Sequence, residues 1–265
     1  MDQPLHVVYT SAFVSISDIR SNESLVDVVP YPLTAGTLVF IRSGLFVRRS
    51  GGESVTLDAN YVLFGREGDY LCADGAAKEP CSCSVIRFAD SSLFDNGSVS
   101  QGVYALSTPT AYLGQTRLLN DVWLGRSEGI DQAALAILSE TIRSITTAYQ
   151  SAGRHSETIR AIRQLVYQSL SQRVSLAEVG RRLYLSPFTV SRLFHRETGI
   201  SLRRYAQRLR LRKALNLMLQ GAGGLTDIAI ELGFYDEPHF SKAFHAEFGI
   251  PPALTLVTVC DRMRR

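Results

Sequence analysis

The sequence predicts an α+β fold in two parts, a β-rich N-terminal half and an all-α C-terminal domain with two helix-turn-helix motifs. Three observations support this prediction. A stretch near residue 176 recurs about fifty residues later, and basic charge is concentrated after residue 155. Between residue 5 and about residue 105, short runs rich in Val, Phe, Tyr and Thr alternate with glycine-containing turns, which is typical of antiparallel β-structure.

The C-terminal repeat is the most informative feature. Seven residues of the first copy have a counterpart fifty positions later, and the single change, from Arg192 to Lys242, is conservative. The seven are Ser191, Arg192, Phe194, His195, Glu197, Gly199 and Ile200. Further upstream the offset is forty-nine, so the second copy has one extra residue between its helices. Each copy therefore predicts a helix, a turn and a second helix.

Capping signals in the first copy support these helices. Ser175 with Glu178 three positions later forms a capping-box pattern, and Ser186 followed by Pro187 is typical of a second helix start. That second helix ends near Gly199, which suits a left-handed C-cap. In the second copy, Asp236 occupies the capping position of the second helix.

The faces opposite the apolar stripes of these second helices remain for water or DNA. A short helix set across a second one by a tight turn places the second helix in the major groove. In the first copy the outward positions are Phe188, Arg192 and His195, with Ser191 and Arg196 at the flanks. In the second copy they are Pro238, Lys242 and His245, with Glu237 and His239 beside them.

Residues 201–220 connect the two copies and predict one basic helix. Such a helix would span roughly 30 Å, close to the ~34 Å between successive major-groove faces. Its apolar stripe changes side halfway, so we expect each half to pack on a different helical bundle. Its basic residues are Arg203, Arg204, Arg208, Arg210, Arg212 and Lys213.

The double motif resembles the DNA-binding domain of the AraC/XylS family of bacterial transcription regulators over about residues 157 to 255. The resemblance is carried by Gly233 and Phe234, then Phe240, Ser241, Phe244, Phe248, Gly249, Pro251 and Pro252. It places the DNA-reading positions on Phe188, Ser191, Arg192 and His195, and on Glu237, Pro238, His239, Ser241 and Lys242. It implies a dimeric cytoplasmic regulator, of the activator or repressor type, that binds double-stranded DNA and works with RNA polymerase.

Charge and composition agree with that expectation. Residues 156–265 contain 17 Lys and Arg against 9 Asp and Glu, whereas the preceding residues are net acidic, which is the footprint of a phosphate-binding domain. At 265 residues and 45% hydrophobic, the chain can form two domains. It has neither an eighteen-residue apolar run nor a signal-peptide pattern, so we expect a cytoplasmic protein without membrane association.

The N-terminal half predicts an antiparallel sandwich or barrel. By resemblance, residues 1–107 form the cupin-like β-barrel sensor domain that often precedes the AraC-type domain, which we expect to occupy residues 156–265. The expected strands are Thr37–Ile41, Leu45–Arg49, Ser54–Leu57, Tyr61–Phe64, Tyr70–Ala73 and Cys83–Phe88.

A binding pocket for a small-molecule effector is expected in this half rather than a catalytic centre. Its single histidine, His6, does not provide the paired histidines of metal-dependent cupin enzymes. The proposed ligand-binding residues are Arg42, Arg48, Phe64 and Tyr70, with Phe40, Phe46 and Arg66 as further candidates. If Arg42 or Arg48 points inward, the ligand would be an anion. The alternative is that these residues are core and surface positions of a sheet.

Cys72, Cys81 and Cys83 form the one cluster of reactive side chains in the N-terminal half. They could bind a metal ion or act as a redox switch if the strand of Cys72 pairs with the strand of the other two. The alternative is that they are small buried residues. No other cofactor is expected. The DNA-binding domain that this sequence resembles also occurs fused to a suicide methyltransferase module, which binds zinc through two pairs of cysteines. The N-terminal half has three neighbouring cysteines and no second pair, so we do not expect an enzyme.

Residues 108–155 are expected to form a helical dimerisation segment and a linker. Helices are predicted from Thr108 to Trp123 and from an N-cap at Asp131. Apolar residues of the second helix recur every three or four positions, a seam that suits a partner helix in a homodimer, with packing onto the β-domain as the alternative. The seam consists of Leu135, Leu138, Ile142, Ile145 and Tyr149. The two function hypotheses are an effector-responsive regulator and one controlled without a small-molecule ligand.

Overall fold

The structure is a computed structural model that describes residues 5–20, 30–51, 53–73, 81–94, 102–145, 157–172 and 174–255. The chain divides into two compact units, residues 1–154 and 155–265. The N-terminal unit contains the strands and two α-helices, and the C-terminal unit is helical throughout its described elements.

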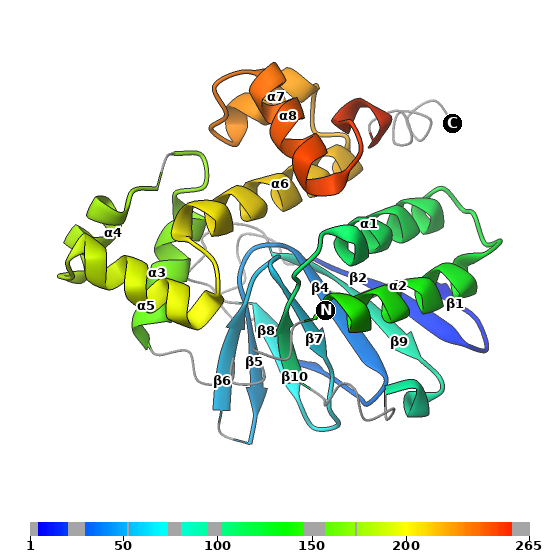
Figure 1. The fold of residues 1–265 in the computed structure, drawn as a ribbon. Helices are drawn as coiled ribbons and strands as arrows, with labels where there is room; N and C mark the ends of the chain where they lie inside the picture. The colour runs from blue at the N-terminus through cyan, green and yellow to red at the C-terminus, as the bar shows by residue number, and fades with distance from the viewer. Residues whose placement is uncertain are drawn as a thin grey trace. The chain divides into compact units, whose positions relative to one another are not determined.

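Two antiparallel sheets make up the β-part of the N-terminal unit (Figure 1). The first has the order β1 (Leu5–Thr10), β2 (Val14–Arg20), β9 (Ser82–Phe88), β4 (Thr37–Ser43), β7 (Tyr61–Phe64) and β10 (Gly102–Ala105). The second has the order β3 (Tyr31–Pro32), β8 (Tyr70–Ala73), β5 (Phe46–Ser50) and β6 (Glu53–Leu57). The prediction of a β-rich domain followed by helices is confirmed, but the described strands form two open sheets and no closed barrel.

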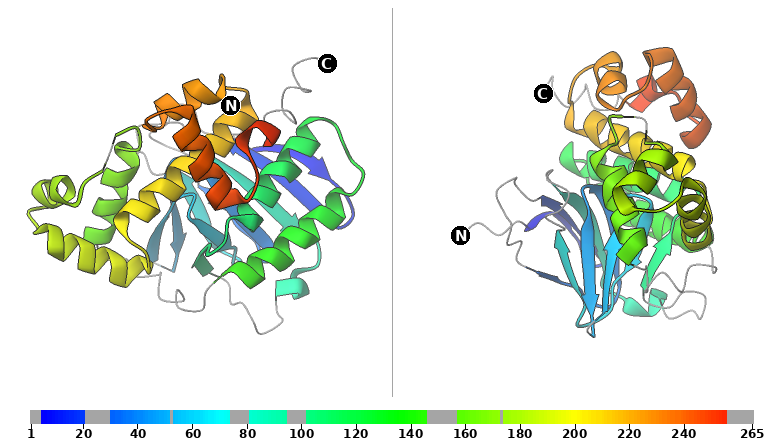
Figure 2. Two further views of the ribbon diagram at one scale, coloured as in Figure 1. Left: turned by 45° about the horizontal axis from the view of Figure 1, so that its top comes forward. Right: turned by 90° about the vertical axis from the view of Figure 1, so that its left-hand side faces the viewer.

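Two helices cover one face of the six-stranded sheet, α1 (Thr110–Trp123) and α2 (Ile130–Ser144) (Figures 1 and 2). The ring of Phe40 on β4 contacts the edge of Tyr112 on α1 at a centroid distance of 6.5 Å. Because helices cover this sheet, β4 and β7 are buried along almost their entire length. Their sequences are accordingly nearly continuous apolar runs rather than alternating ones. A short 3₁₀ helix, η2 (Ser91–Phe94), follows β9.

The start of α2 differs from the prediction that Asp131 caps it. Gly129 occupies the N-cap with a φ of 74°, a conformation that suits glycine, and Asp131 lies in the first turn. The Asp131 carboxylate accepts hydrogen bonds from the hydroxyls of Tyr9 (3.2 Å) and Ser11 (2.9 Å). Asp131 therefore ties α2 to the β1–β2 hairpin instead of capping the helix.

The C-terminal unit contains two helix-turn-helix modules. Module 1 consists of α4 (Leu176–Leu183) and α5 (Pro187–Thr198), and module 2 of α7 (Leu225–Glu231) and α8 (Glu237–Phe248). α3 (Glu157–Gln168) precedes module 1, and α6 (Leu202–Gln220) runs between the modules as one unbroken helix (Figure 1).

The expected caps of the modules are confirmed. The Ser175 hydroxyl accepts from the amide of Glu178 (3.1 Å), Ser186 from Thr189 (3.1 Å), and the Asp236 carboxylate from His239 (2.7 Å). These bonds satisfy amide groups that have no partner inside the helix, so they fix where α4, α5 and α8 begin.

The change of side in the apolar stripe of α6 has the expected consequence. Tyr205 in its first half packs edge-on against Phe194 of module 1 at a centroid distance of 5.0 Å. Apolar residues of the second half, such as Leu215 and Met218, are fully buried, and α6 also contacts α7 and α8. Each module thus packs on its own part of α6.

A second connection, which we call the inter-module joint, links α6 and module 2 to the segment after α3. Arg210 on α6 donates through Nε to the carbonyl of Leu170 (2.6 Å) and through its terminal nitrogen to that of Gln172. Gly233 in the turn of module 2 lies so close to Ser171 that a Cβ on Gly233 would be 2.2 Å from the Ser171 carbonyl oxygen. The joint therefore fixes module 2 relative to the end of α3.

Candidate nucleic-acid interface

The second helix of each module exposes most of the positions expected to read DNA. Of the nine, seven are exposed, and Glu237 and Ser241 are half-buried. The exposed seven are Phe188, Ser191, Arg192, His195, Pro238, His239 and Lys242. The phenyl ring of Phe188 is 74% exposed, which is unusual for a large apolar side chain near a packed module.

The opposite faces of α5 and α8 are completely buried. Val190 and Phe194 in module 1, and Phe240 and Phe244 in module 2, have no accessible surface. Each recognition helix is therefore attached to its module through one face and leaves the other free, which is the geometry that a major-groove helix requires.

Arg192 and Lys242 occupy equivalent positions on α5 and α8 and are both exposed. Among the described residues, neither forms an ion pair, whereas neighbouring Arg196 is paired with Glu197 (2.9 Å). Their charges are therefore available to phosphates or to base edges.

Glu237 at the start of α8 is held by a neighbour that the sequence did not reveal. The hydroxyl of Thr226, at the start of α7, donates to the Glu237 carboxylate at 2.5 Å. The contact joins residues eleven positions apart across the turn of module 2, so no short-range sequence pattern could have indicated it.

The basic residues of α6 are not one exposed row. Arg203 and Arg204 are exposed, but Arg212 has no accessible surface, and Arg208 forms an ion pair with Glu247 on α8 (3.3 Å). Burial lowers the pKa of Arg208, with Glu247 opposing that effect. Arg210 belongs to the inter-module joint. The basic helix predicted over residues 201–220 is present, but only two of its arginines, both near the start of α6, are fully exposed.

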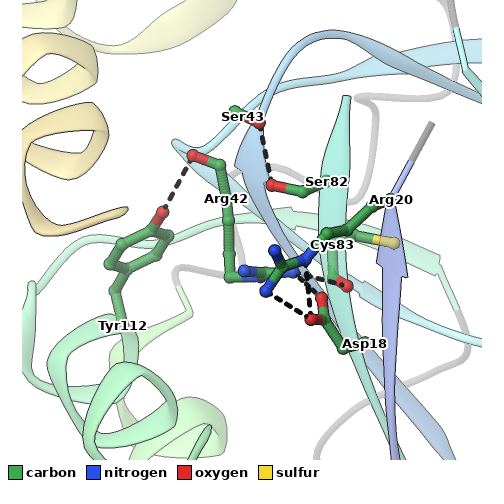
Figure 3. A network of polar contacts seen from close by, with 7 residues as sticks. All are labelled: Asp18, Arg20, Arg42, Ser43, Ser82, Cys83 and Tyr112. Atoms are coloured by element: carbon green, nitrogen blue, oxygen red, sulfur yellow. Dashed lines mark hydrogen bonds and ion pairs between the residues drawn. The ribbon is translucent and has the colours of Figure 1, made fainter. Parts of the chain in front are cut away.

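In the N-terminal unit, Arg42 is part of a buried ionic network (Figure 3). Its guanidinium is 1% exposed and is paired with Asp18, which also pairs with Arg20 (2.8 Å). Trp123 on α1 lies over both cations, with the Arg20 Cζ 4.7 Å from the ring centroid. Burial lowers the pKa of Arg42 and Asp18 opposes the shift. The network fastens α1 to the sheet, and Asp18 already balances the charge of Arg42.

The other proposed ligand residues lie apart from Arg42. Arg48 is nearly buried and bonds through Nε to Asp69 at 2.6 Å. Phe64 is a core residue packed against Tyr104 at a centroid distance of 5.4 Å, while Tyr70 is 46% exposed on β8. The structure does not bring these side chains into one pocket, so the alternative of core and surface positions describes them better than an anion site.

The three cysteines are buried, and two of them lie in different sheets. Cys72 lies on β8, which pairs with β3 and β5, whereas Cys83 lies on β9 between β2 and β4, so the strand pairing that a shared site requires is absent from the described sheets. Burial raises the pKa of both thiols. The Cys81 thiol donates to the Leu45 carbonyl at 3.6 Å. No group of three metal-ligating side chains occurs among the described residues.

The residues of the expected dimer seam do not share one exposed face. Leu138 is buried within the unit, Leu135 is 44% exposed, and Ile142 and Ile145 are half-buried. Ile145 lies beyond the helix and forms a β-bridge with Leu106. Tyr149 lies outside the described residues. Part of the seam therefore packs onto its own unit, which was the alternative to dimerisation.

Leu135 also lines a groove that the sequence did not indicate. The groove has a volume of about 610 Å³. Its apolar lining includes Leu93 and Phe13, which is 70% exposed, and Asp90 and Asp131 lie in its wall. Phe13 in the β1–β2 hairpin was the available signal, since hairpin turns seldom carry a solvent-exposed phenylalanine.

Comparison with known proteins shows what the chain is similar to. A family model described as a helix-turn-helix domain matches residues 179–256. The chain is 28% identical over 223 residues to the uncharacterized HTH-type transcriptional regulator YidL of Escherichia coli K12, covering 77% of this chain and 69% of YidL. It is 25% identical over 230 residues to the HTH-type transcriptional activator RhaR of Mannheimia succiniciproducens, covering 84% of this chain and 76% of RhaR.

A shorter stretch of the chain has a higher identity to another relative. The HTH-type transcriptional activator RhaS of Shigella boydii is 42% identical over 74 residues, which are 28% of this chain and 27% of RhaS. These relatives are transcription regulators, not enzymes. In the described part of the chain, no helix is long and apolar enough to cross a membrane. Residues 179–256, which include most of both helix-turn-helix modules and all of α6, thus match a helix-turn-helix domain family, and over a longer stretch the chain is similar to HTH-type transcription regulators.

Proposed function

We propose that α5 and α8 enter two successive major-groove segments of one DNA duplex and that the N-terminal unit controls this binding. The observation that carries the proposal is the exposure of Arg192 and Lys242 at equivalent positions on helices whose opposite faces are buried. Arg192 and Lys242 contact base edges or phosphates, and Phe188 contacts a thymine methyl group. The same face supplies Ser191 and His195 in module 1, and Glu237, His239 and Ser241 in module 2.

Glu237 gives module 2 a different preference from module 1. A carboxylate at the tip of a recognition helix accepts from the amino group of cytosine. Thr226 holds this carboxylate in place, so it is preorganised before DNA arrives. Module 1 has Pro187 at the equivalent position and so lacks such an acceptor.

The test is a comparison of Arg192→Ala with Lys242→Ala on duplexes selected by the wild-type protein from a random library. Each variant should lose about 1–3 kcal/mol and relax base preference in one half-site only. Arg196→Ala is the control, because Arg196 is exposed on the same helix but paired with Glu197. Equal weakening on all sequences would assign Arg192 to the DNA backbone instead.

We propose further that the protein acts in the cytoplasm as a homodimer that works with RNA polymerase, and that an effector binds the N-terminal unit. The ion pairs of Arg42 and Arg48 favour the groove beside Phe13 over an anion pocket as the effector site. Its volume is that of sites for drug-sized ligands. Because Leu135 on α2 lines the groove, an effector there would change the surface that α2 offers a second copy, which couples binding to assembly.

The effector proposal is tested by thermal shift of the wild-type protein and of Leu135→Asp against a library of apolar small molecules. A compound that binds only the folded state raises the melting temperature of the wild type and not that of the variant. Sedimentation of both proteins reports whether α2 carries the dimer contact. If no compound stabilises the wild type, the alternative of a regulator without a small-molecule ligand is favoured.

A further inference from the structure

The C-terminal unit contains a cleft that, apart from His239, the proposed base contacts do not use. The cleft has a volume of about 430 Å³ and brings together both modules and the first half of α6. Its lining includes Ser175 at the start of α4, Arg203 and Gln207 of α6, and His239 of α8.

The cleft is electropositive. Arg203 is exposed and forms no ion pair among the described residues, and Arg210 adds a second positive charge while its N–H groups hold the inter-module joint. No carboxylate is among the described residues that line the cleft. Ser175 caps α4, so the positive end of that helix dipole also faces this space. Such a site favours an anion.

The cleft lies where a bound duplex presents phosphates. If α5 and α8 occupy successive major grooves on one side of the DNA, the minor groove between these grooves faces the protein. The two phosphate backbones that border this minor groove then pass between α5 and α8. His239 lies both on the recognition helix and in the cleft wall, so the cleft opens beside the DNA-reading face of α8.

We propose that this cleft binds a phosphate of the DNA backbone between the two contacted major-groove segments. Arg203 donates the principal charge-assisted hydrogen bond, and the Gln207 amide and the His239 imidazole donate further ones. Phe234 supports the His239 ring at a centroid distance of 5.6 Å. The proposal rests on the proposed DNA binding and adds a contact that sets the register of both modules at once.

Arg204 provides a matched control on the same helix. It follows Arg203 directly, is also an exposed arginine, and does not line the cleft. Its positive charge acts on Arg208, which places it on a neighbouring face of α6. Arg203→Ala and Arg204→Ala therefore remove the same charge from the same stretch of helix at two different places.

The experiment measures affinity for the duplex that the wild-type protein selects, and for copies in which one backbone phosphate at a time is a neutral methylphosphonate. In the wild type and in Arg204→Ala, substitution of one phosphate between the contacted segments should weaken binding about tenfold. Arg203→Ala should lose about as much on the unmodified duplex and be insensitive to that same substitution. Its salt dependence should fall by about one phosphate contact, and Arg203→Lys should restore most of the affinity.

The proposal is overturned if methylphosphonate substitution at each position between the contacted segments weakens binding of Arg203→Ala as much as binding of the wild type. It is also overturned if inorganic phosphate raises the melting temperature of the wild type, but not that of Arg203→Ala, and no methylphosphonate between the contacted segments changes the affinity for DNA. In that case the cleft takes a free phosphate rather than DNA. Failure of the wild type to prefer any duplex sequence is a different result, and it would remove the proposed function itself.

Discussion

The two modules have the same helix-turn-helix, but they place their glycines differently. In module 1 the amide of Leu185 donates to the carbonyl of Gly180 (2.8 Å), and in module 2 the amide of Phe234 donates to that of Ala229 (2.9 Å), so these turns are equivalent. Module 1 has its glycine on the first helix, and a tyrosine takes the left-handed conformation that Gly233 adopts in module 2. Ala229 occupies the position in module 2 that Gly180 occupies in module 1.

This difference shows that the turns serve different neighbours. A Cβ on Gly180 would be 2.4 Å from the Leu185 carbonyl oxygen within module 1, whereas a Cβ on Gly233 would meet Ser171, outside module 2. The side chain of Tyr184 is 96% exposed. The turn of module 2 is therefore a packing surface of the inter-module joint, while the turn of module 1 faces solvent.

The sharpest test of the comparison is Gly233→Ala. Both the left-handed φ of 72° and the close Ser171 carbonyl oppose a side chain, so we expect a loss of about 3 kcal/mol or more in unfolding free energy. Gly249→Ala is the control, since Gly249 has a φ of 71° and nothing within 4 Å of its added Cβ, and should cost about 1–2 kcal/mol. Urea unfolding measures both, and equal losses would mean that the contact with Ser171 contributes nothing.

Gly180→Ala should have the next largest effect, about 2–3 kcal/mol, because the added methyl group collides with backbone. The reciprocal change in module 2, Ala229→Gly, introduces no collision and should cost about 1–2 kcal/mol through lower helix propensity and the loss of a buried methyl group. The melting temperatures of the two variants show which change is the more destabilising. The comparison fails if Ala229→Gly is the more damaging change.

Tyr184→Gly should leave the protein equally stable or stabilise it by up to about 1 kcal/mol. The tyrosine has a φ of 57°, the one positive value among the described non-glycine residues, and glycine relieves that strain at some cost in chain entropy. Tyr184→Val tests the opposite direction, because a β-branched side chain fits this conformation poorly. Destabilisation by glycine would instead indicate that the exposed ring makes a stabilising contact.

The smallest expected effect is a pH dependence specific to module 1. Hydrogen bonds from Arg181 and Arg182 hold the pKa of Glu178 below its ordinary value of 4.5. A carboxyl whose folded pKa is lowered contributes stability above its unfolded pKa, and this contribution disappears as the pH falls through the folded value. Melting temperatures between pH 7 and pH 3 should therefore decline slightly less in Glu178→Gln than in the wild type. Identical dependences of melting temperature on pH would show that these surface hydrogen bonds contribute nothing to the free energy of unfolding.

The repeat made the C-terminal unit predictable, because caps such as Ser186 and Asp236 and the apolar stripes are local signals. The strands Tyr61–Phe64 and Tyr70–Ala73 were predicted with the bounds that β7 and β8 have. Strand pairing was not predictable, since it depends on contacts far apart in sequence. For that reason the sequence suggested a shared site for Cys72 and Cys83, which the structure places in different sheets.

Buried charges limited the prediction of sites in the same way. Arg42 and Arg212 look like surface or ligand-binding residues in the sequence, because arginine is rarely buried. Both have almost no accessible surface, and Arg42 finds Asp18 twenty-four positions away. Exposure of Arg192 and Lys242 followed directly from helical periodicity, whereas the Thr226–Glu237 contact required the turn geometry.

The hydrogen bonds from Arg210 to the carbonyl groups after α3 have a consequence for the DNA sites that the protein can bind. Two modules joined by a flexible linker would bind DNA sites in which the gap between the two contacted segments varies in length. Because Arg210 fixes the two modules relative to each other, each copy of the protein should bind one asymmetric motif with an invariant gap between its two elements. Inserting five base pairs into that gap turns the second element to the far side of the helix, and such a promoter should no longer respond.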